Sequence, residues 1–506
     1  MNWKRIIVAA ATWKKYHAFI NDTCHPEHAK NRLWNKEILP LIQQTSFWRQ
    51  SSHFNKTQSL DSFAITTYND YESSLIAALH STKQPFNNEE IIYWAETSAT
   101  SGKRKYFPIT TSFQRQFQRT MTPFFHSLIK RFPDFLNHKI LYLAAYSTEE
   151  VSPAGVPMGF ISHFNYHRLP PLIKSFYALP SEVFADSVTF HQWAPLYALA
   201  HDLSALFAIT PMAIEAFYTR CSENLAFYLP YLLGQKSLPA HLPSLKISKK
   251  RQEYLRHLNY NSLSYQTLWP TLTLSGCWIA GPCQPFAYRL VEQMGNHITL
   301  VDGAYSATEG WMTVPIETEH RGGILHPGAH IVEFIEEGKD IKKEHLLQSW
   351  ELKQGKQYEI FLTTAMGFVR YQLKDIVKCT GFYNRAPRLE FCYKSAQIRL
   401  DVCTISEQEL RCMLQQVNLE METHWFFCRD SRGDKLILVT DTETSLNETV
   451  IQSMHKILLA ISEPYAYSVR MGEIRPLEWR QLPKERLLKN SHAQSKPKLI
   501  SQEILE

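Results

Sequence analysis

A strand–helix–strand pattern near the middle of the chain constrains the fold more than any other feature. Residues 272–279 and 298–302 are short apolar runs that predict buried strands, and residues 285–294 between them predict a helix. Two strands joined by a helix are typical of α/β proteins with a parallel sheet. Ligands of such sheets bind beyond the carboxyl ends of the strands. The segments that follow the two runs, residues 280–281 and 305–310, are therefore predicted to lie at a ligand site.

The segment TSATSGKRK, residues 97–105, combines hydroxyl groups, small residues and cations. Apolar residues 91–95 precede it and residues 106–109 follow it, so we expect a loop between two strands. Such a loop can donate backbone N–H groups and hydroxyls to phosphate oxygens while lysine supplies charge. It is not a Walker A loop, because that motif needs a glycine five residues before the Gly-Lys pair and Ser or Thr after it. Taken alone, the segment is also compatible with a polar surface turn.

Length and composition predict a globular protein of more than one domain. A chain of 506 residues is too long for one ordinary core, and its 44% hydrophobic and 13% aromatic content argues against disorder. A net charge of +6 is mild over this length and gives no reason to expect a nucleic-acid partner. Nine scattered cysteines, with no CxxC pair and no zinc-ligand spacing, predict reduced thiols in a cytoplasmic protein.

Two apolar stretches raise the question of a membrane segment, and neither predicts one. Residues 1–11 resemble a short signal peptide, but residues 13–15 (WKK) end the apolar run and no clean cleavage pattern follows. A helix packed on the body of the protein is expected there instead. Residues 194–214 contain His201 and Asp202, which favours a buried helix and loop over a membrane span.

Residues 328–382 alternate with the two-residue period of strands. They indicate a β-rich subdomain next to the α/β unit. Asp375 falls in the turn expected between the last two of its strands. The strands are predicted at residues 330–335, 358–362, 368–371 and 376–379.

After residue 381 the pattern changes to that of a smaller α+β unit. A capping box formed by Ser406 and Glu409 predicts a helix that runs to about residue 417. We therefore predict two domains, residues 1–382 and residues 383–506. The other elements expected in the second domain are strands at residues 389–393, 424–428 and 436–440 and a helix at residues 450–461.

Three separated segments resemble the nucleotide motifs of one enzyme superfamily. They are residues 97–105, residues 305–310 (YSATEG) and residues 371–377 (YQLKDIV). Their order and spacing are similar to those of adenylate-forming enzymes, and in particular of the Gretchen Hagen (auxin-responsive) acyl-acid amido synthetases and their bacterial relatives. Further similarity at residues 268–281 and 321–334, and at the hinge that follows, extends the resemblance over nearly the whole chain.

The resemblance implies an α/β fold, with a large N-terminal α/β domain of the adenylate-forming type, a β-rich subdomain and a small mobile α+β domain at the C-terminus. It also implies an ATP-dependent ligase that adenylates a carboxylic acid and releases pyrophosphate. The amine of an amino acid then attacks the adenylate, giving an amide and AMP. ATP and Mg²⁺ are the implied cofactors, and small-molecule acids and amino acids are the implied partners.

The first motif and the end of the chain carry five of the implied site residues. Ser98, Thr100, Ser101 and Lys105 suit the binding of ATP phosphates through hydroxyl groups and charge. The late segment QSKPK resembles a family segment in which Lys496 is the swinging lysine that neutralises charge during adenylation. The lysine two residues later is a rival for this role, and a solvated tail lysine is the alternative interpretation.

The second and third motifs carry the other implied site residues. Tyr305 can pack its ring or its backbone against adenine, and Thr308 can donate to the α-phosphate. Glu309 suits a carboxylate ligand for Mg²⁺, with an acid at a helix N-terminus as the alternative. Asp375 can accept from both ribose hydroxyls, with an ordinary turn aspartate as the alternative, and Lys378 is a basic residue that helps to bind phosphate.

The chain departs from the family pattern at several positions. Ala99 replaces the first glycine of the loop, Gln372 and Lys374 replace an expected Arg and Gly around Asp375, and Cys403 with the following threonine replaces a Glu-Lys pair. These departures leave two other functions open. One is an adenylating ligase with a thiol or protein acceptor, and the other is a nucleotide-binding relative that has lost catalysis.

The acyl group is expected to bind among residues 115–210. Phe160, Phe164, Tyr166 and Trp193 are candidate lining residues. Aromatic residues at such spacing are more often part of an ordinary core.

Overall fold

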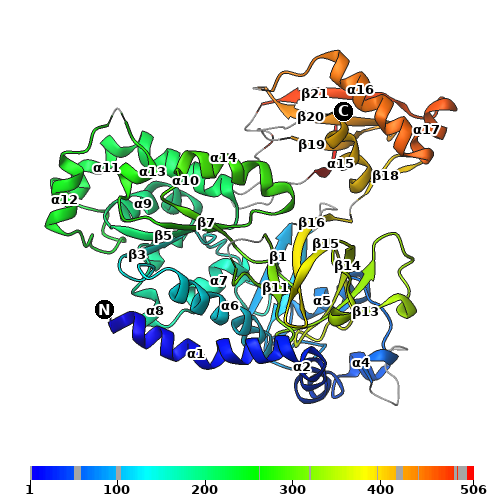
Figure 1. Ribbon diagram of the computed structural model, residues 1–506, viewed down its shortest axis with the longest axis horizontal. Helices are drawn as coiled ribbons and strands as arrows, with labels where there is room; N and C mark the ends of the chain where they lie inside the picture. The colour runs from blue at the N-terminus through cyan, green and yellow to red at the C-terminus, as the bar shows by residue number, and fades with distance from the viewer. Residues whose placement is uncertain are drawn as a thin grey trace.

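The computed structural model shows two bodies of unequal size (Figure 1). The large body holds most of the helices and four of the sheets, and the residues from 397 onward form a smaller body at its edge (Figure 1). The structure describes residues 3–50, 59–98, 104–260, 262–317, 321–395, 397–417, 425–442, 444–483, 487 and 499–505.

A parallel four-stranded sheet forms the centre of the large body. In β6, Leu274 pairs with Ala205 of β5 on one side and with Thr299 of β7 on the other. The predicted strand–helix–strand pattern is therefore confirmed, with the helix as α14 (Gln284–Met294). In spatial order the strands are β3 (Lys139–Tyr142), β5 (Leu203–Phe207), β6 (Leu274–Cys277) and β7 (Thr299–Asp302).

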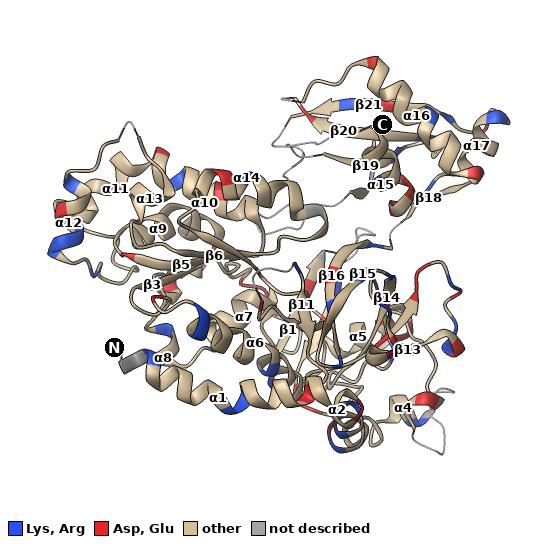
Figure 2. Ribbon diagram, in the orientation of Figure 1, with Lys and Arg blue, Asp and Glu red and all other residues tan. Residues whose placement is uncertain are grey.

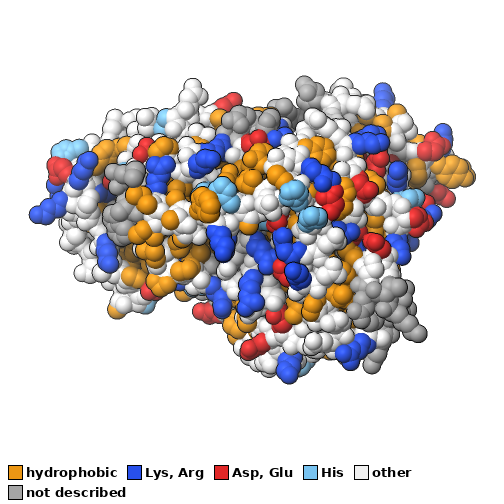
Figure 3. Space-filling model, turned by 60° about the horizontal axis from the view of Figure 1, so that its bottom comes forward, with side chains coloured by type: hydrophobic (Ala, Val, Ile, Leu, Met, Phe, Trp, Pro, Cys, Tyr) orange, Lys and Arg blue, Asp and Glu red, His pale blue; other side chains and the backbone are white. Residues whose placement is uncertain are grey.

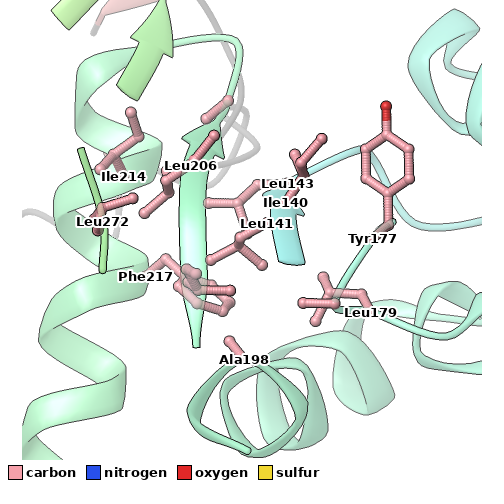
Figure 4. Packing of buried hydrophobic residues seen from close by; sticks show 14 of the residues in the cluster. Ile140, Leu141, Leu143, Tyr177, Leu179, Ala198, Leu206, Ile214, Phe217 and Leu272 are labelled. Carbon is pink, nitrogen blue, oxygen red and sulfur yellow. The ribbon is translucent and has the colours of Figure 1, made fainter. Parts of the chain in front are cut away.

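Apolar side chains from the parallel sheet and its helices form one continuous core. Figure 4 shows Leu141 and Leu206, from adjacent strands, close to Ile214 and Phe217 of α10. All four are 5% exposed or less. Most residues of these strands are buried because helices cover the sheet. The helices packed around it include α6 (Thr111–Arg131), α9 (Ser187–Leu199) and α10 (Pro211–Glu223).

The β-rich part of the large body is built on a seven-stranded sheet. Its strand order is β10-β11-β16-β15-β14-β12-β13, in which the outermost strands are the short β10 (Thr313–Val314) and β13 (Leu347–Gln348). A three-stranded sheet beside it contains the hairpin of β1 (Tyr93–Ser98) and β2 (Arg104–Ile109), which enclose the hydroxyl-rich segment as expected. The main strands of the seven-stranded sheet are β11 (Gly323–Leu325), β12 (Ile331–Glu336), β14 (Gln357–Thr363), β15 (Tyr371–Tyr383) and β16 (Ala386–Lys394).

The prediction of a turn at Asp375 is wrong, because β15 runs without a break from Tyr371 to Tyr383. The alternation of side chains does shift near this residue. Lys374 has a φ of 59°, and the pairing of β15 with β16 slips between Ile376 and Val377. This irregularity disturbs the apolar period and imitates a turn in the sequence.

The hairpin of β15 and β16 crosses the domain boundary that we expected after residue 382. Strand β16 pairs with both β15 and β11, so residues 386–394 belong to the seven-stranded sheet. The small C-terminal sheet, with its own hydrophobic core, begins after these residues. We therefore propose a boundary near residue 395.

The small body is an α+β unit, as the sequence predicts. Ser406 and Glu409 form the predicted capping box at the start of α15 (Glu407–Gln416), in which the Ser406 hydroxyl accepts from the Glu409 N–H at 3.2 Å. Its other helices are α16 (Glu448–Ile461) and α17 (Glu463–Arg470). Its strands are the pair β17 (Gln397–Arg399) and β18 (Thr404–Ser406) and a sheet of β19 (Trp425–Asp430), β20 (Lys435–Asp441), β21 (Arg475–Leu482) and β22 (Ile500–Leu505).

The first helix, α1 (Trp3–Cys24), packs along the large body as expected (Figure 1). Phe19 is fully buried, and the Thr12 hydroxyl lies 2.8 Å from Nδ1 of His126 in α6. Within the described part of the chain, no helix has the length and apolar character needed to span a bilayer. Charged residues occur mainly on outer helices and loops (Figure 2). One face mixes apolar side chains with a central group of Lys and Arg (Figure 3).

Candidate active site

A cavity of about 620 Å³ opens at the carboxyl ends of the parallel strands. Tyr142 ends β3, Phe207 ends β5, and Gly303 follows β7, and all three line the cavity. This is the position predicted for a ligand site in an α/β sheet. The small body contributes as well, because Glu407 and Ile500 reach the same cavity.

One end of the cavity is lined by aromatic side chains, and we call it the aromatic compartment. It lies between α6, α9, α10 and the strand ends. Apart from the aromatic rings, His191 and Arg220 also face it and contact each other. Its aromatic residues are Phe117, Phe124, Phe125, Tyr142, Tyr146, Phe160, Tyr177, Phe190, Phe207 and Phe217.

Of the four aromatic residues expected to line an acyl site, only Phe160 lines the cavity. Phe164 stacks on Tyr93 with ring centroids 4.6 Å apart, and the Tyr166 hydroxyl donates to the Leu179 carbonyl. Trp193 packs edge-on against Tyr231 of α11 (Leu225–Leu232). These three side chains are core residues, because they point from α7 (Ile161–His167) and α9 toward neighbouring elements rather than toward the cavity.

The other end of the cavity is charged, and we call it the charged end. Lys105, Glu309, Lys374, Lys394 and Glu407 line it. Burial raises the pKa of Glu309, and the nearby cations Lys394 and Lys105 oppose this rise. Burial lowers the pKa of Lys105, and Glu309 opposes that shift. Lys105 and Glu309 thus interact in a space that is partly shielded from water, where charge interactions are stronger than in bulk water.

Asp375 is held from two sides beneath the charged end. Only 3% of the residue is exposed. The Tyr305 hydroxyl donates to Oδ2 at 2.7 Å, and the Lys394 ammonium lies 3.0 Å from Oδ1. Asp375 in turn raises the pKa of Lys394. The buried carboxylate is therefore paired and hydrogen-bonded, as an ionised group in an interior must be.

Tyr305 positions Asp375 instead of presenting its ring to the cavity. The ring is 2% exposed and stacks on Phe391 at a centroid distance of 5.7 Å. The cavity wall is formed by its neighbours, Ala304 and Ser306. A contact between adenine and the backbone of this segment therefore remains open, whereas a ring contact does not fit this arrangement.

The cavity brings together some of the predicted residues and leaves others apart. Lys105, Thr308 and Glu309 line it. Lys378 lies on the exposed side of β15, away from the lining residues. Ser98 is the last residue of β1, and its neighbour Thr97 lines the cavity. Thr100, Ser101 and Lys496, together with Ala99 and Lys498, fall outside the described residues.

Lys394 is the site residue that the sequence did not reveal. It is the register partner of Asp375 across β15 and β16, and the hairpin brings the two residues together although they are nineteen positions apart along the chain. Lys394 is the last residue of an apolar strand, and nothing in the local sequence indicates that such a basic residue belongs to a site. The strand pairing would have been needed to find it. Among the described residues, no cluster of three His, Cys, Asp or Glu side chains is placed to hold a metal ion.

An α/β body, a β-rich subdomain and a small C-terminal unit thus share one cavity with an aromatic compartment and a charged end. Sequence comparison identifies the family of this arrangement. The GH3 (Gretchen Hagen 3) family N-terminal domain matches residues 15–299, and the GH3 family central domain matches residues 323–394. The chain belongs to the GH3 family.

Curated relatives are plant enzymes of this family. A jasmonoyl–L-amino acid synthetase of Nicotiana attenuata, JAR6, is 24% identical over 69% of this chain and 66% of its own length. A jasmonoyl–L-amino acid synthetase of Oryza sativa subsp. japonica, GH3.5, is 29% identical over 43% of this chain and 42% of its own length. The matched regions therefore span less than two thirds of these relatives.

A solved structure shows the same fold over almost the entire chain. The acyl acid amido synthetase AtGH3.15, in complex with 2,4-DB, superposes with a TM-score of 0.74. The superposition covers 96% of this chain and 94% of that one, although only 16% of the aligned residues are identical. The expected fold, a large N-terminal α/β part with a smaller C-terminal one, is confirmed.

Proposed function

We propose that this protein is an ATP-dependent acyl-acid amido synthetase. It adenylates a carboxylic acid, releases pyrophosphate, and transfers the acyl group to the amine of an amino acid with release of AMP. The observation that carries the proposal is one continuous cavity, in a GH3-family fold, that joins an aromatic compartment to a charged end. The relatives that are named jasmonoyl–L-amino acid synthetases support it.

The residues at the charged end suit the first half of this reaction. A carboxylate is a poor electrophile because its oxygen is a poor leaving group, and adenylation replaces that leaving group with AMP. Charge develops on phosphate oxygens during the transfer, so preorganised cations and donors lower the barrier. Lys105 and Lys394 supply the charge, and the Thr308 hydroxyl supplies a donor.

Glu309 fits the role of magnesium ligand. Mg²⁺ is usually held by one or two carboxylates together with substrate phosphates, so a full cage of protein ligands is not needed. Glu309 is a carboxylate that lines the charged end, where Lys105 and Lys394 are its neighbours. This is the part of the cavity that we assign to the phosphates. When bound, Mg²⁺ supplies positive charge to the phosphate oxygens.

Asp375 and Lys394 suit an exchange of partners when nucleotide binds. Asp375 is the ribose ligand implied by the family motif, and both of its oxygens are engaged, by Tyr305 and by Lys394. For a ribose hydroxyl to reach Oδ1, the Lys394 ammonium must leave it. Lys394 lines the cavity, so it can move toward the phosphate instead.

The aromatic compartment favours an apolar, aromatic or cyclic carboxylic acid as the substrate. Such rings gain most from burial against phenyl and phenol side chains.

The nine cysteines are all free thiols, which supports the reducing, cytoplasmic location expected from the sequence. A thiol or protein acceptor would share the same first half-reaction and differ only in the nucleophile.

One observation favours the alternative of a nucleotide-binding relative that has lost catalysis. Gln372, where the family motif has Arg, donates its side-chain amide to Glu359 at 2.7 Å, so this position brings no guanidinium to the charged end. A nucleotide-binding protein without catalysis is therefore the second candidate. Measurement of AMP formation separates it from the first.

The test is to incubate the protein with Mg²⁺, ATP, a panel of aromatic and alicyclic acids and mixed amino acids, and to follow AMP and the amide by mass spectrometry. We expect AMP that depends on the acid. Asp375→Ala removes acceptors for the ribose hydroxyls and should weaken ATP binding by about 2–3 kcal/mol, or about 30- to 150-fold. Lys496→Ala should lower the rate of adenylation with a smaller effect on ATP binding.

Asp340→Ala is the control, because 72% of the Asp340 side chain is exposed and it lies outside the cavity. ATP binding without AMP formation, whichever acid is added, would favour a nucleotide-binding protein without catalysis. Failure to bind ATP at all would contradict the proposal as a whole.

A further inference from the structure

Glu96 stands at the junction between the charged end and the aromatic compartment. It lines the cavity from β1. The next residue, Thr97, pairs with Lys105, which reaches the charged end. The preceding residue pairs with Gly159, after which Phe160 enters the aromatic compartment. If the acyl group occupies the aromatic compartment and the phosphate the charged end, the C–O bond of the acyl-adenylate lies at this junction.

Among the described residues, the Glu96 carboxylate has only a long ion pair with Arg104 and a side-chain hydrogen bond with Glu150. Its side chain is 11% exposed. Oε1 is buried without a hydrogen bond to any described residue, and Oε2 lies 3.5 Å from the guanidinium of Arg104, beyond the range of a good hydrogen bond. Arg104 bonds Glu150 instead, at 2.7 Å. A buried carboxylate in this state has the capacity to bind a ligand with N–H donors.

The other carboxylates of the cavity are differently placed. Three carboxylates line its described part: Glu96, Glu309 and Glu407. Glu309 lies in the field of the cations of the charged end, and Glu407 accepts two bonds from Arg411, at 2.7 and 3.1 Å. Glu96 is therefore the lining carboxylate most able to receive a cationic group from a substrate.

The electrostatics around Glu96 favour proton acceptance. Burial raises the pKa of Glu96, the charge of Glu150 raises it further, and Arg104 opposes both. Tyr93, on the same strand, is neutral because burial and the charge of Glu96 raise its pKa. A carboxylate with a raised pKa is a stronger base than an exposed one, which brings it closer to the pKa suited to general base catalysis near neutral pH.

We propose that Glu96 binds the ammonium group of the incoming amino acid and acts as the general base for its attack on the acyl-adenylate. This inference rests on the proposed function. At neutral pH the amine is protonated and has no free electron pair, so a proton must leave before the nitrogen can attack. A buried carboxylate at the junction both attracts the ammonium and accepts that proton.

The attack converts the ammonium group and the acyl-adenylate into an amide and AMP. One ammonium proton moves to a Glu96 oxygen, and the freed electron pair of nitrogen forms the C–N bond to the acyl carbon. The C–O bond to the phosphate breaks, and its electron pair leaves with AMP. The nitrogen then loses its second proton to solvent, which leaves a neutral amide, and Glu96 returns its proton to solvent.

The experiment separates the two half-reactions in Glu96→Gln. The first is measured as acid-dependent exchange between ATP and pyrophosphate, and the second as amide formation with an amino acid or with hydroxylamine, which is mostly unprotonated at neutral pH. We expect exchange within about twofold of the unaltered protein. Amide formation with the amino acid should fall by about 10²- to 10⁴-fold, the usual contribution of a general base. The reaction with hydroxylamine should change by less than about threefold, because it needs no such base.

Two further measurements sharpen the result. The deficit of Glu96→Gln with amino acids should shrink as pH rises, because more of the free amine is already unprotonated. Asp340→Asn is the control: 72% of the Asp340 side chain is exposed and the residue lies outside the cavity lining, so amide formation should stay within about threefold. Retained exchange in Glu96→Gln also shows that the variant folds.

Three results would overturn the inference. Normal amide formation in Glu96→Gln would show that the carboxylate has no part in it. Equal losses with hydroxylamine and amino acids would assign Glu96 a structural role only. An unaltered protein without exchange for any acid would overturn the proposed function, and this inference with it, and that result is distinct from a loss confined to the second half-reaction.

Discussion

At the scale of single residues, Lys374 combines a cavity position with an unfavourable backbone. Its φ of 59° is in the left-handed region, where the Cβ of an ordinary residue crowds the following carbonyl at a cost of about 1–2 kcal/mol. The family motif has glycine there. Lys374→Gly should therefore raise the free energy of unfolding by about 0.5–1 kcal/mol, after allowing for the greater flexibility of glycine in the unfolded chain. Urea denaturation measures this.

Asn88→Gly is the matched control for that substitution. Asn88 has the same φ of 59° but is exposed, and asparagine tolerates this region better than lysine does. Its stability should change by less than about 0.5 kcal/mol. A loss of stability in Lys374→Gly would show that contacts of the lysine side chain outweigh the backbone cost.

The motifs predicted the identity of single residues better than their partners. Asp375 was found in the sequence from its place in a short segment, and so was Glu309. The hydroxyl of Tyr305, from the loop after β7, and the ammonium of Lys394, from β16, hold Asp375. Contacts between distant segments are not encoded in any local pattern, and for this reason the sequence left open whether the ring or the backbone of Tyr305 packs against adenine.

At the scale of elements, a buried ion pair fastens β12 to the residues that lead into β15. Arg370 donates to both oxygens of Glu333, each at 2.8 Å, and also to the Phe63 carbonyl at 2.8 Å. The two side chains are 3% and 1% exposed. Glu333→Gln leaves the buried guanidinium with only the exposed carboxylate of Asp61, 3.3 Å away, as a counter-charge, so it should lower the free energy of unfolding by about 3–5 kcal/mol. Chemical denaturation tests this.

The exposed pair of Arg470 and Glu463 on α17 provides the comparison. These side chains are 65% and 81% exposed, and their atoms are 3.1 Å apart. Glu463→Gln should change stability by less than about 1 kcal/mol, because solvent screens exposed charges. Similar effects at both pairs would show that burial of Glu333 does not govern the strength of its ion pair.

Elements with a clean period were predicted well, and those with irregular backbones were not. The alternation in β12 and β14 and the capping box of α15 each matched the structure. The bulged strand β15 was split in two because a register shift breaks the two-residue period. The sequence prediction placed β15 and β16 in different domains for a related reason. The sequence pattern changes after residue 381, before the seven-stranded sheet ends at Lys394.

At the scale of the whole molecule, buried histidines make stability depend on pH. Burial lowers the pKa of His326 to about 3, and it lowers the pKa of His330 likewise to about 3. The unfolded chain, with ordinary histidine pKa values near 6.5, binds protons between pH 6.5 and pH 3 that the folded chain does not. Stability is therefore full above pH 6.5 and falls as pH decreases, by about 2 kcal/mol for each of these residues from pH 7 to pH 5.

Denaturation of His330→Gln at both pH values tests this prediction. The variant should lose about 2 kcal/mol less than the unaltered protein between pH 7 and pH 5. His80→Gln, at an exposed position, should leave the difference unchanged. An identical pH dependence in His330→Gln and the unaltered protein would mean that His330 does not remain neutral in the folded state.

The sequence by itself determined the α/β class, most of the regular elements and the residues of the short motifs. Hydrophobic periodicity, capping and motif spacing are local properties, and a chain carries them whatever its tertiary contacts. Only the tertiary structure decided which of these residues meet. Lys394 reaches Asp375 through strand pairing, the aromatic compartment collects rings from separate helices, and Glu96 stands between the two ends of the cavity. Such neighbours are brought together by packing across long stretches of chain, which no local pattern specifies.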